Sequence, residues 1–196
     1  DNDLSGSDFT IGYDTALNTV VQAVDKIRDT ASSHNRLFFI EVMGRDAGFI
    51  ALNSGLATGA EDILIPETKT YIDDLTHRLE FEWRKNKKSA IIIVAEGDDE
   101  GGAYEIAKKV TEKFDFYKSR VTILGHVQRG GSPTCNDRVL ASRLGYEAVE
   151  ALLKGRKNEM VGIIDKKVVF TPFSQSIKTE GKMNHHLLDI ARILSL

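Results

Sequence analysis

The stretch of eight residues from 125 to 132 combines the groups from which a protein can build an anion site. His126 and Arg129 stand three positions apart, and two glycines and a Ser-Pro pair follow them. The apolar run at 121–124 predicts a strand that leads directly into this turn, and a long helical pattern comes after it. Cations, permissive backbone and a helix N-terminus at a strand end are typical of phosphate sites in α/β proteins. We therefore expect an organic phosphate as the ligand.

A second glycine-containing turn, Met43–Gly48, follows the apolar run 37–42 and leads into a predicted helix. Its glycines permit the backbone to approach a ligand closely. The helix start supplies N–H donors without intrahelical partners, and Arg45 supplies a positive charge. Many turns between a strand and a helix have this glycine spacing without binding anything, so the motif is weak on its own.

Cationic side chains cluster near predicted strand ends in a chain whose net charge is −3. They are Arg36, Arg45, Arg120, His126 and Arg129. Taken alone, Arg36 is explained as a solvated strand cap and His126 as a hydrogen-bonded structural residue. Charge-assisted hydrogen bonds contribute roughly 1.5–3 kcal/mol each. Three or four of them on one phosphate would suffice for micromolar recognition.

Carboxylates provide the other half of a possible reaction. Glu96 follows the apolar run 90–95, where it could bind sugar hydroxyls or belong to a solvated acidic loop. Asp1 and Asp3 form a pair, and a carboxylate beside a bound hydroxyl is the usual general base of phosphoryl transfer. Nothing in the sequence places this pair near the arginines, and a flexible acidic tail explains it equally well.

Composition narrows the class of protein. A chain of 196 residues with 41% hydrophobic and 28% charged residues is typical of a globular protein of one large or two small domains. Its acidic balance excludes general nucleic-acid binding, and no apolar run approaches the ~20 residues of a membrane span. Cys135 is the only cysteine, so an intrachain disulfide or a cysteine metal cluster is excluded. We expect a cytoplasmic protein.

The elements that must position these residues alternate between strands and helices. Apolar periodicity predicts helices at 14–33, 46–58, 73–88, 101–114, 135–153 and 184–194, and strands at 37–42, 63–65, 90–95 and 121–124. A hairpin is predicted from 161–164 and 167–170. The alternation predicts a doubly wound α/β fold, with a mostly parallel sheet and helices on both faces. No P-loop, dinucleotide fingerprint, zinc pattern or nucleophile elbow occurs.

Taken together, the signatures resemble those of the bacterial-type 6-phosphofructokinase family over almost the whole chain. They are Asp1-Asn2-Asp3, the segment 9–16, Ser32–Arg36, Glu41–Arg45 and Leu124–Pro133. The resemblance implies a transfer of phosphoryl from ATP or pyrophosphate to the 1-hydroxyl of fructose 6-phosphate. It implies Asp1 as the general base, Asp3 as its electrostatic support, and Arg45 as a group that stabilises the transferred phosphoryl.

The resemblance also implies a substrate site. Met43, Gly44 and Arg45 would line the sugar, Glu96 and Arg129 would hold it, and His126 would bind its 6-phosphate. Arg36 and Arg120 would reach the substrate of a neighbouring subunit, so a homo-oligomer is expected. The effector residues of the family, for ADP or phosphoenolpyruvate, correspond to Arg28, Glu61, Lys85 and Lys87, although a solvated helix end explains several of these equally well.

The resemblance further implies a division of the chain into parts. Residues 1–12 would be a remnant of the nucleotide lobe, 13–124 the fructose 6-phosphate lobe, 125–172 a segment returning toward the nucleotide lobe, and 173–196 a C-terminal end. The nucleotide lobe would precede Asp1, so we expect the contacts for Mg²⁺ and ATP to lie outside this chain and the chain to be inactive alone. A non-catalytic sugar-phosphate-binding or regulatory module is the alternative. An unrelated Rossmann-type binding domain would explain the alternation of strands and helices but not the ordered signatures.

Overall fold

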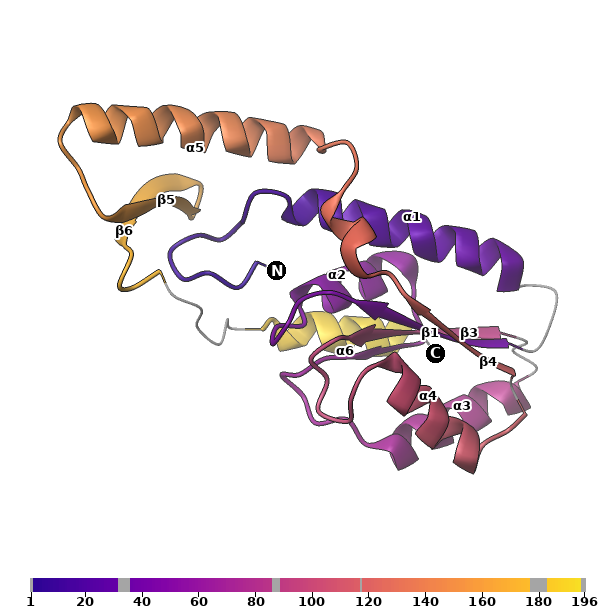
Figure 1. The fold of residues 1–196 in the computed structure, drawn as a ribbon. Coiled ribbons are helices and arrows are strands. Elements are labelled where there is room, and N and C mark those ends of the chain that lie inside the picture. The colour runs from indigo at the N-terminus through magenta and orange to yellow at the C-terminus, as the bar shows by residue number, and fades with distance from the viewer. Residues whose placement is uncertain (1, 32–35, 86–88, 117, 177–182, 195–196) are drawn as a thin grey trace.

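A four-stranded parallel sheet forms the centre of the molecule, and an arm extends from it (Figure 1). The computed structural model describes residues 2–31, 36–85, 89–116, 118–176 and 183–194. The strands are β1 (Arg36–Val42), β2 (Asp62–Leu64), β3 (Ser89–Ala95) and β4 (Lys118–Ile123), in the order β2-β3-β1-β4. Every neighbouring pair in this sheet is parallel, which confirms the predicted fold class.

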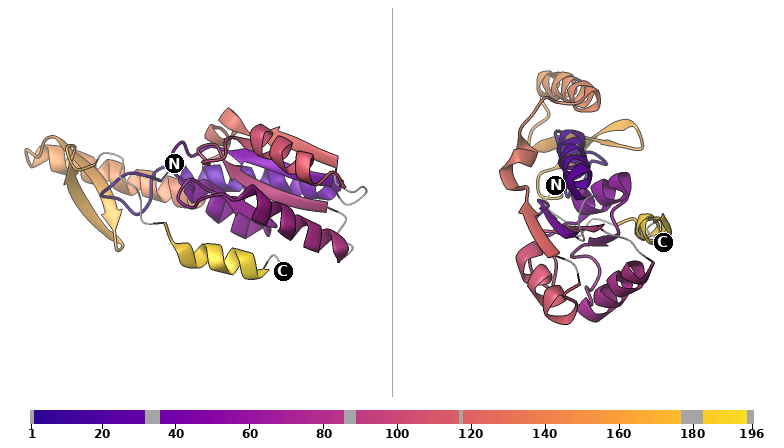
Figure 2. Two further views of the ribbon diagram at one scale, coloured as in Figure 1. Left: turned by 90° about the horizontal axis from the view of Figure 1, so that it is seen from below. Right: turned by 90° about the vertical axis from the view of Figure 1, so that its right-hand side faces the viewer.

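Helices cover both faces of the sheet (Figure 2). One face carries α1 (Tyr13–Ala31), α2 (Phe49–Thr58) and α6 (His185–Leu194), and the other carries α3 (Ile72–Arg84) and α4 (Ala103–Lys113). Because both faces are covered, β1 and β3 are apolar along almost their whole length instead of alternating. The sheet is therefore a rigid platform for whatever its strand ends hold.

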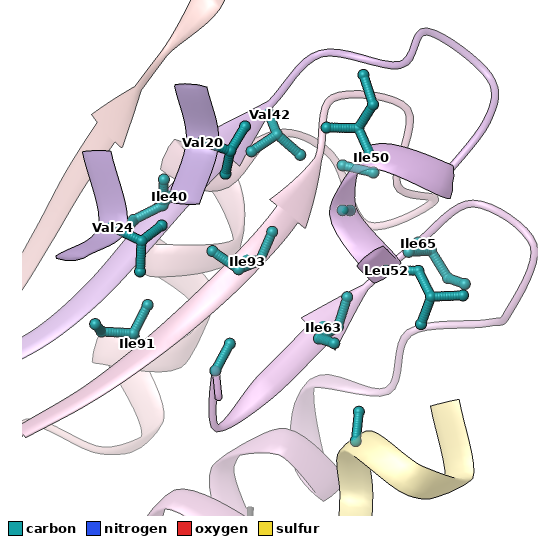
Figure 3. Packing of buried hydrophobic residues seen from close by; sticks show 14 of the residues in the cluster. Val20, Val24, Ile40, Val42, Ile50, Leu52, Ile63, Ile65, Ile91 and Ile93 are labelled. Atoms are coloured by element: carbon teal, nitrogen blue, oxygen red, sulfur yellow. The ribbon is translucent and has the colours of Figure 1, made fainter. Parts of the chain in front are cut away.

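The core beneath α1 and α2 is built from branched aliphatic side chains (Figure 3). Ile40, Ile91 and Ile93 of the sheet meet Val20 and Val24 of α1, and all five are 2% exposed or less. Full burial of such a side chain stabilises the fold by roughly 1.5–3 kcal/mol. This packing fixes α1 and α2, and with them the loops that join them to the sheet.

The arm consists of α5 (Cys135–Leu153) and a hairpin of β5 (Glu159–Ile164) and β6 (Lys167–Pro172). The hairpin turns at Asp165-Lys166, as predicted, with φ values of 48° and 65° that match the tight turn favoured between antiparallel strands. Along α5 several large apolar side chains are exposed: Val139, Tyr146, Val149, Leu152 and Leu153. A short 3-10 helix, η1 (Gly125–Arg129), connects β4 to the arm.

The structure corrects several predicted boundaries. The helix predicted at 46–58 begins only at Phe49, because residues 43–48 form a hydrogen-bonded turn. The helix predicted at 73–88 ends at Arg84, and residues 86–88 lie outside the described part. The Ser-Pro pair at 132–133 precedes α5 without opening it, since Thr134 caps the helix by accepting a hydrogen bond from the Asp137 N–H at 3.2 Å.

Parallel strands give the sheet two chemically different edges. The carboxyl ends of β1 to β4 meet at one edge, which we call the carboxyl edge, and helices begin there. The opposite edge, called the amino edge, holds the strand starts and the ends of the helices that connect the strands. Ligands of such sheets bind beyond the carboxyl edge.

Candidate functional site

The carboxyl edge brings together several of the residues expected to bind substrate. Met43, Gly44 and Arg45 follow β1 directly, and Glu96 follows the neighbouring strand β3. η1 continues from β4, on the other side of β1, and carries His126 and Arg129. The backbone links these ends, since the Glu96 N–H donates to the carbonyl of Val42 at 3.0 Å. These residues therefore lie at the same edge of the sheet.

The loop after β1 has an unusual backbone. Gly44 has a φ of 156° and Arg45 a φ of 50°, so an arginine lies in the left-handed region. That conformation is uncommon for residues other than glycine and has to be held by its surroundings. Gly97 approaches from β3 so closely that a Cβ there would lie 2.0 Å from the Arg45 carbonyl oxygen. The conformation of this loop is thus fixed from outside.

Side chains from neighbouring strand ends hold the loop amides. The Met43 N–H donates to Gln128 Oε1 at 2.9 Å, and Glu96 Oε1 accepts from Gly44 at 3.3 Å and from Arg45 at 2.6 Å. These three amides are therefore engaged by side chains of the protein itself.

The far end of the loop is held in the same way. Glu67, just after β2, accepts a hydrogen bond from the Gly48 N–H at 2.9 Å, and Gly48 is the N-cap of α2. Sequence reasoning missed both Gln128 and Glu67. Gln128 lies between His126 and Arg129 in the sequence, and this position is a signal by which it could have been found. The sequence carries no such signal for Glu67.

Three cations of this edge have side chains that bind no other described residue. Arg45, His126 and Arg129 are exposed. Within the described residues, their side chains form no hydrogen bond or ion pair with another residue, while the nearby carboxylate Glu96 is engaged by backbone amides. Next to Arg129 lies a hollow of about 530 Å³ between the starts of α1 and α5. These exposed cations are therefore accessible to an anionic ligand.

Asp137 of α5 pins the arm to this hollow. Its carboxylate accepts hydrogen bonds from the Gly12 and Thr15 N–H groups, each at 2.8 Å, and from the Thr15 hydroxyl. It thereby caps the start of α1, whose first turn also contains Asp14. Burial acts to raise the pKa of Asp137, but these hydrogen bonds outweigh it and the pKa lies below its ordinary value.

Arg36 and Arg120 lie toward the amino edge. Arg36 opens β1, and Arg120 of β4 pairs with Phe38 near the start of β1. Seven residues separate Arg36 from Met43, which at ~3.3 Å per residue is about 23 Å along the strand. One chain therefore does not bring Arg36 to the phosphate that His126 and Arg129 could bind. The expected action of Arg36 and Arg120 on a neighbouring subunit stays a prediction.

The residues expected to bind an effector also lie at the amino edge. Arg28 donates to the carbonyl oxygens of Thr58 and Gly59, at 2.6 and 3.1 Å, where α2 ends. Glu61 accepts from the Ile91 N–H, and the Lys85 ammonium lies 4.3 Å from the ring centre of Phe81. Each of these three side chains therefore has a local structural role. An effector role stays a prediction for them, and Lys87 lies outside the described residues.

The expected catalytic carboxylates are described only in part. Asp1 lies outside the described residues, and Asp3 is half-buried in the segment 2–12, which runs between the sheet and the hairpin (Figure 1). Their catalytic roles stay predictions. In the described part of the chain, no three His, Cys, Asp or Glu side chains are grouped so that they could hold a metal ion. No helix among those residues is long and apolar enough to cross a membrane.

Comparison with known proteins gives consistent results. The family profile described as phosphofructokinase matches residues 1–152. The chain is 53% identical over 196 residues to ATP-dependent 6-phosphofructokinase 2 of Bacteroides thetaiotaomicron and 56% identical to ATP-dependent 6-phosphofructokinase of Listeria monocytogenes. Each match covers 100% of this chain and 60% of the relative. The chain thus spans about 60% of the length of the curated relatives it matches.

Solved structures show the same fold. The phosphofructokinase from Saccharomyces cerevisiae superimposes with a TM-score of 0.82 and 36% identity, covering 90% of this chain and 24% of the yeast chain. The pyrophosphate-dependent phosphofructokinase from Marinobacter aquaeolei gives a TM-score of 0.78 and 25% identity, over 94% of this chain and 52% of the other.

Proposed function

Because this chain belongs to the phosphofructokinase family, we propose that it forms the sugar-phosphate-binding part of a 6-phosphofructokinase. The whole enzyme would transfer a phosphoryl group from ATP to the 1-hydroxyl of fructose 6-phosphate and release fructose 1,6-bisphosphate. One observation supports this most strongly. Three cations that have no side-chain partner among the described residues, Arg45, His126 and Arg129, lie at the carboxyl edge beside a loop held by hydrogen bonds.

In this proposal the two sides of the edge have different tasks. His126 and Arg129 of η1 bind the 6-phosphate and the sugar, and residues 43–45 line the sugar with Glu96. By binding the sugar phosphate in one orientation, these residues position the acceptor hydroxyl and so lower the activation barrier of phosphoryl transfer. Arg45 stabilises the negative charge of the transferring phosphoryl group with its guanidinium, which extends from a backbone that Glu96 holds by a hydrogen bond.

Proton transfer falls to the N-terminal carboxylates. Asp1 takes the proton from the 1-hydroxyl as that oxygen attacks, and Asp3 supports it electrostatically, which together typically add ~10²–10⁴ in rate. The reaction class uses Mg²⁺ and ATP. Among the described residues, no three His, Cys, Asp or Glu side chains are grouped so that they could hold a metal ion. We assign neither the metal nor the nucleotide to particular residues. ATP is favoured over pyrophosphate as donor by the names of the relatives at 53% and 56% identity.

The proposal includes an oligomer and a cellular location. Arg36 opens β1, about 23 Å along the strand from Met43, and a second copy would bring Arg36 and Arg120 to a neighbouring subunit's substrate. We therefore propose a homo-oligomer with shared substrate sites, working in the cytoplasm. Regulation through Arg28, Glu61, Lys85 and Lys87 by ADP or phosphoenolpyruvate is part of the same proposal.

Calorimetric titration of the full-length protein with fructose 6-phosphate tests the binding proposal. We expect wild type to bind in the micromolar range and His126→Ala to bind at least tenfold more weakly. Fructose, which lacks the phosphate, serves as the control ligand and should give no measurable binding to either protein. Equal affinity of wild type and His126→Ala for fructose 6-phosphate would contradict the proposal.

A further inference from the structure

Three side chains from three different strand ends hold the loop 43–48. Gln128 of η1, beyond β4, binds the amide of Met43, Glu96 beyond β3 binds the next two amides, and Glu67 beyond β2 binds the amide of Gly48. We call these three residues the loop supports. Because the first, middle and last parts of the loop are each tied to a different strand end, the loop has little freedom to move as a unit or to refold locally.

Two of the loop supports contain buried polar atoms with no partner. Within the described residues, Gln128 Nε2 and Glu67 Oε2 are the buried side-chain nitrogen and oxygen atoms that have no hydrogen-bond partner. The Gln128 residue is only 2% exposed. An unpaired buried donor or acceptor lowers stability, and an apolar residue of similar shape would avoid that cost. Both exceptions occur in residues that hold the same loop.

We propose that Gln128 and Glu67 are positioning residues for sugar-phosphate binding. They hold the two ends of the loop so that Arg45 keeps its left-handed conformation, with a φ of 50°. Since that conformation is intrinsically unfavourable for arginine, a loop released at either end would leave it. The proposal rests on the function proposed above, because it takes fructose 6-phosphate as the ligand.

Gln128 also links the two halves of the site. It lies between His126 and Arg129 in η1, and its buried side chain reaches across to Met43. Through this one hydrogen bond, the segment that carries the phosphate-binding cations and the loop that carries Arg45 are held in a fixed relation. The loss of the bond is therefore expected to affect sugar-phosphate binding more than nucleotide binding.

Two pairs of variants in the full-length protein test the proposal. Gln128→Met and Glu67→Met keep the approximate shape but remove the acceptor, while Glu67→Gln keeps an acceptor oxygen for the Gly48 amide. Ser54→Ala is the matched control, because Ser54 is fully buried in α2 and its hydroxyl bonds only carbonyls of that helix, at 2.6 and 3.4 Å. It removes buried hydrogen bonds without touching the loop.

We expect each Met variant to raise the KM for fructose 6-phosphate roughly tenfold and to leave the KM for ATP within about twofold. Glu67→Gln should stay near wild type, and Ser54→Ala should lower the melting temperature without changing either KM. Met variants with wild-type KM values, or a Glu67→Gln variant as impaired as Glu67→Met, would overturn the proposal. If Gln128→Met does not fold, the comparison of Glu67→Met with Glu67→Gln tests the proposal by the same criterion.

A ligand-free measurement separates this inference from the proposed function. Amide hydrogen exchange at Met43 should be at least about tenfold faster in Gln128→Met than in wild type, while the amide of Leu124, bound to Glu41 O at 3.1 Å, keeps its protection. If wild type has no activity on fructose 6-phosphate, the proposed function fails, but this readout still tests the loop support. Unchanged exchange at Met43 overturns the support itself.

Discussion

The two edges of the sheet use opposite kinds of side chain. At the carboxyl edge, where helices begin, acceptors bind backbone N–H groups, as Glu67 does for Gly48 and Glu41 does for Ala103 at 2.8 Å. At the amino edge, where helices end, a cation binds backbone carbonyls, as Arg28 does at the end of α2. This division follows from helix polarity, because helices expose donors at their starts and acceptors at their ends.

This difference between the two edges helps to distinguish cations with a structural role from cations that bind a ligand. A cation at the amino edge is accounted for by the helix ends, whereas a cation at the carboxyl edge meets no such structural demand. Arg45, His126 and Arg129 are cations of this second kind. Their residue type is the reverse of what the local backbone needs, and an anionic ligand explains it.

Replacement of a carboxyl-edge cation should have the largest effect on binding. Arg129→Ala is expected to weaken fructose 6-phosphate about 100-fold, because a charge-assisted contact to the sugar phosphate is lost. The melting temperature should be unchanged, since the Arg129 side chain has no partner among the described residues. Calorimetry measures the affinity for fructose 6-phosphate, and a thermal melt measures the melting temperature. A large loss of stability with normal binding would place Arg129 on the structural side of the comparison.

Replacement of Asp137, which connects α5 to the start of α1, should affect the stability of the fold more than the binding of fructose 6-phosphate. Asp137→Asn is expected to destabilise the fold by about 2 kcal/mol at pH 7, because the mutation removes charge-assisted hydrogen bonds to the start of α1.

The stabilisation by Asp137 is expected to depend on pH. The pKa of Asp137 is lowered in the fold, so its contribution is fully present above the ordinary aspartate value of about 3.9 and is lost as pH falls through the lower folded value. Urea unfolding of both proteins from pH 7 down to pH 3 should show the gap between wild type and Asp137→Asn shrinking only at the acid end. A gap that is constant over this range contradicts the assignment.

A cation of the amino edge should matter only in an assembly. Arg120→Ala is expected to weaken fructose 6-phosphate about tenfold in the full-length oligomer and to have no effect on protein diluted to monomers. Titration at two protein concentrations, with sedimentation to establish the assembly state, measures this. Wild-type affinity of the assembled Arg120→Ala variant would remove Arg120 from the shared site.

The smallest effect is expected where a cation has a structural partner. Arg28→Met should cost about 1 kcal/mol of stability, because two hydrogen bonds to the end of α2 are lost. Chemical unfolding measures this cost. Full wild-type stability together with a lost response to ADP would instead assign Arg28 to the effector site alone.

Much of this arrangement could be predicted from the sequence, and the reason is physical. The apolar runs of β1 and β3 and the helical periodicities are local signals, and parallel strands place residues before and after them on opposite edges. The position of His126 after one strand and of Arg36 before another therefore already assigns them to different edges, although the sequence reasoning had grouped them as one cluster.

The loop supports could not be predicted in this way. The bond from Met43 to Gln128 joins residues 85 positions apart, and the bond from Gly48 to Glu67 joins residues 19 apart. Such pairs depend on the order of strands in the sheet, which no single sequence motif encodes. For the same reason the sequence carries no sign that three side chains bind amides of the turn 43–48.

A crystal structure of the full-length protein with fructose 6-phosphate tests the central claim most directly, through the position of the 6-phosphate. Our account predicts the phosphate at the carboxyl edge, in contact with His126 and Arg129 of one subunit. A phosphate bound only at the amino edge of its own chain, beside Arg28 and Lys85, would contradict it.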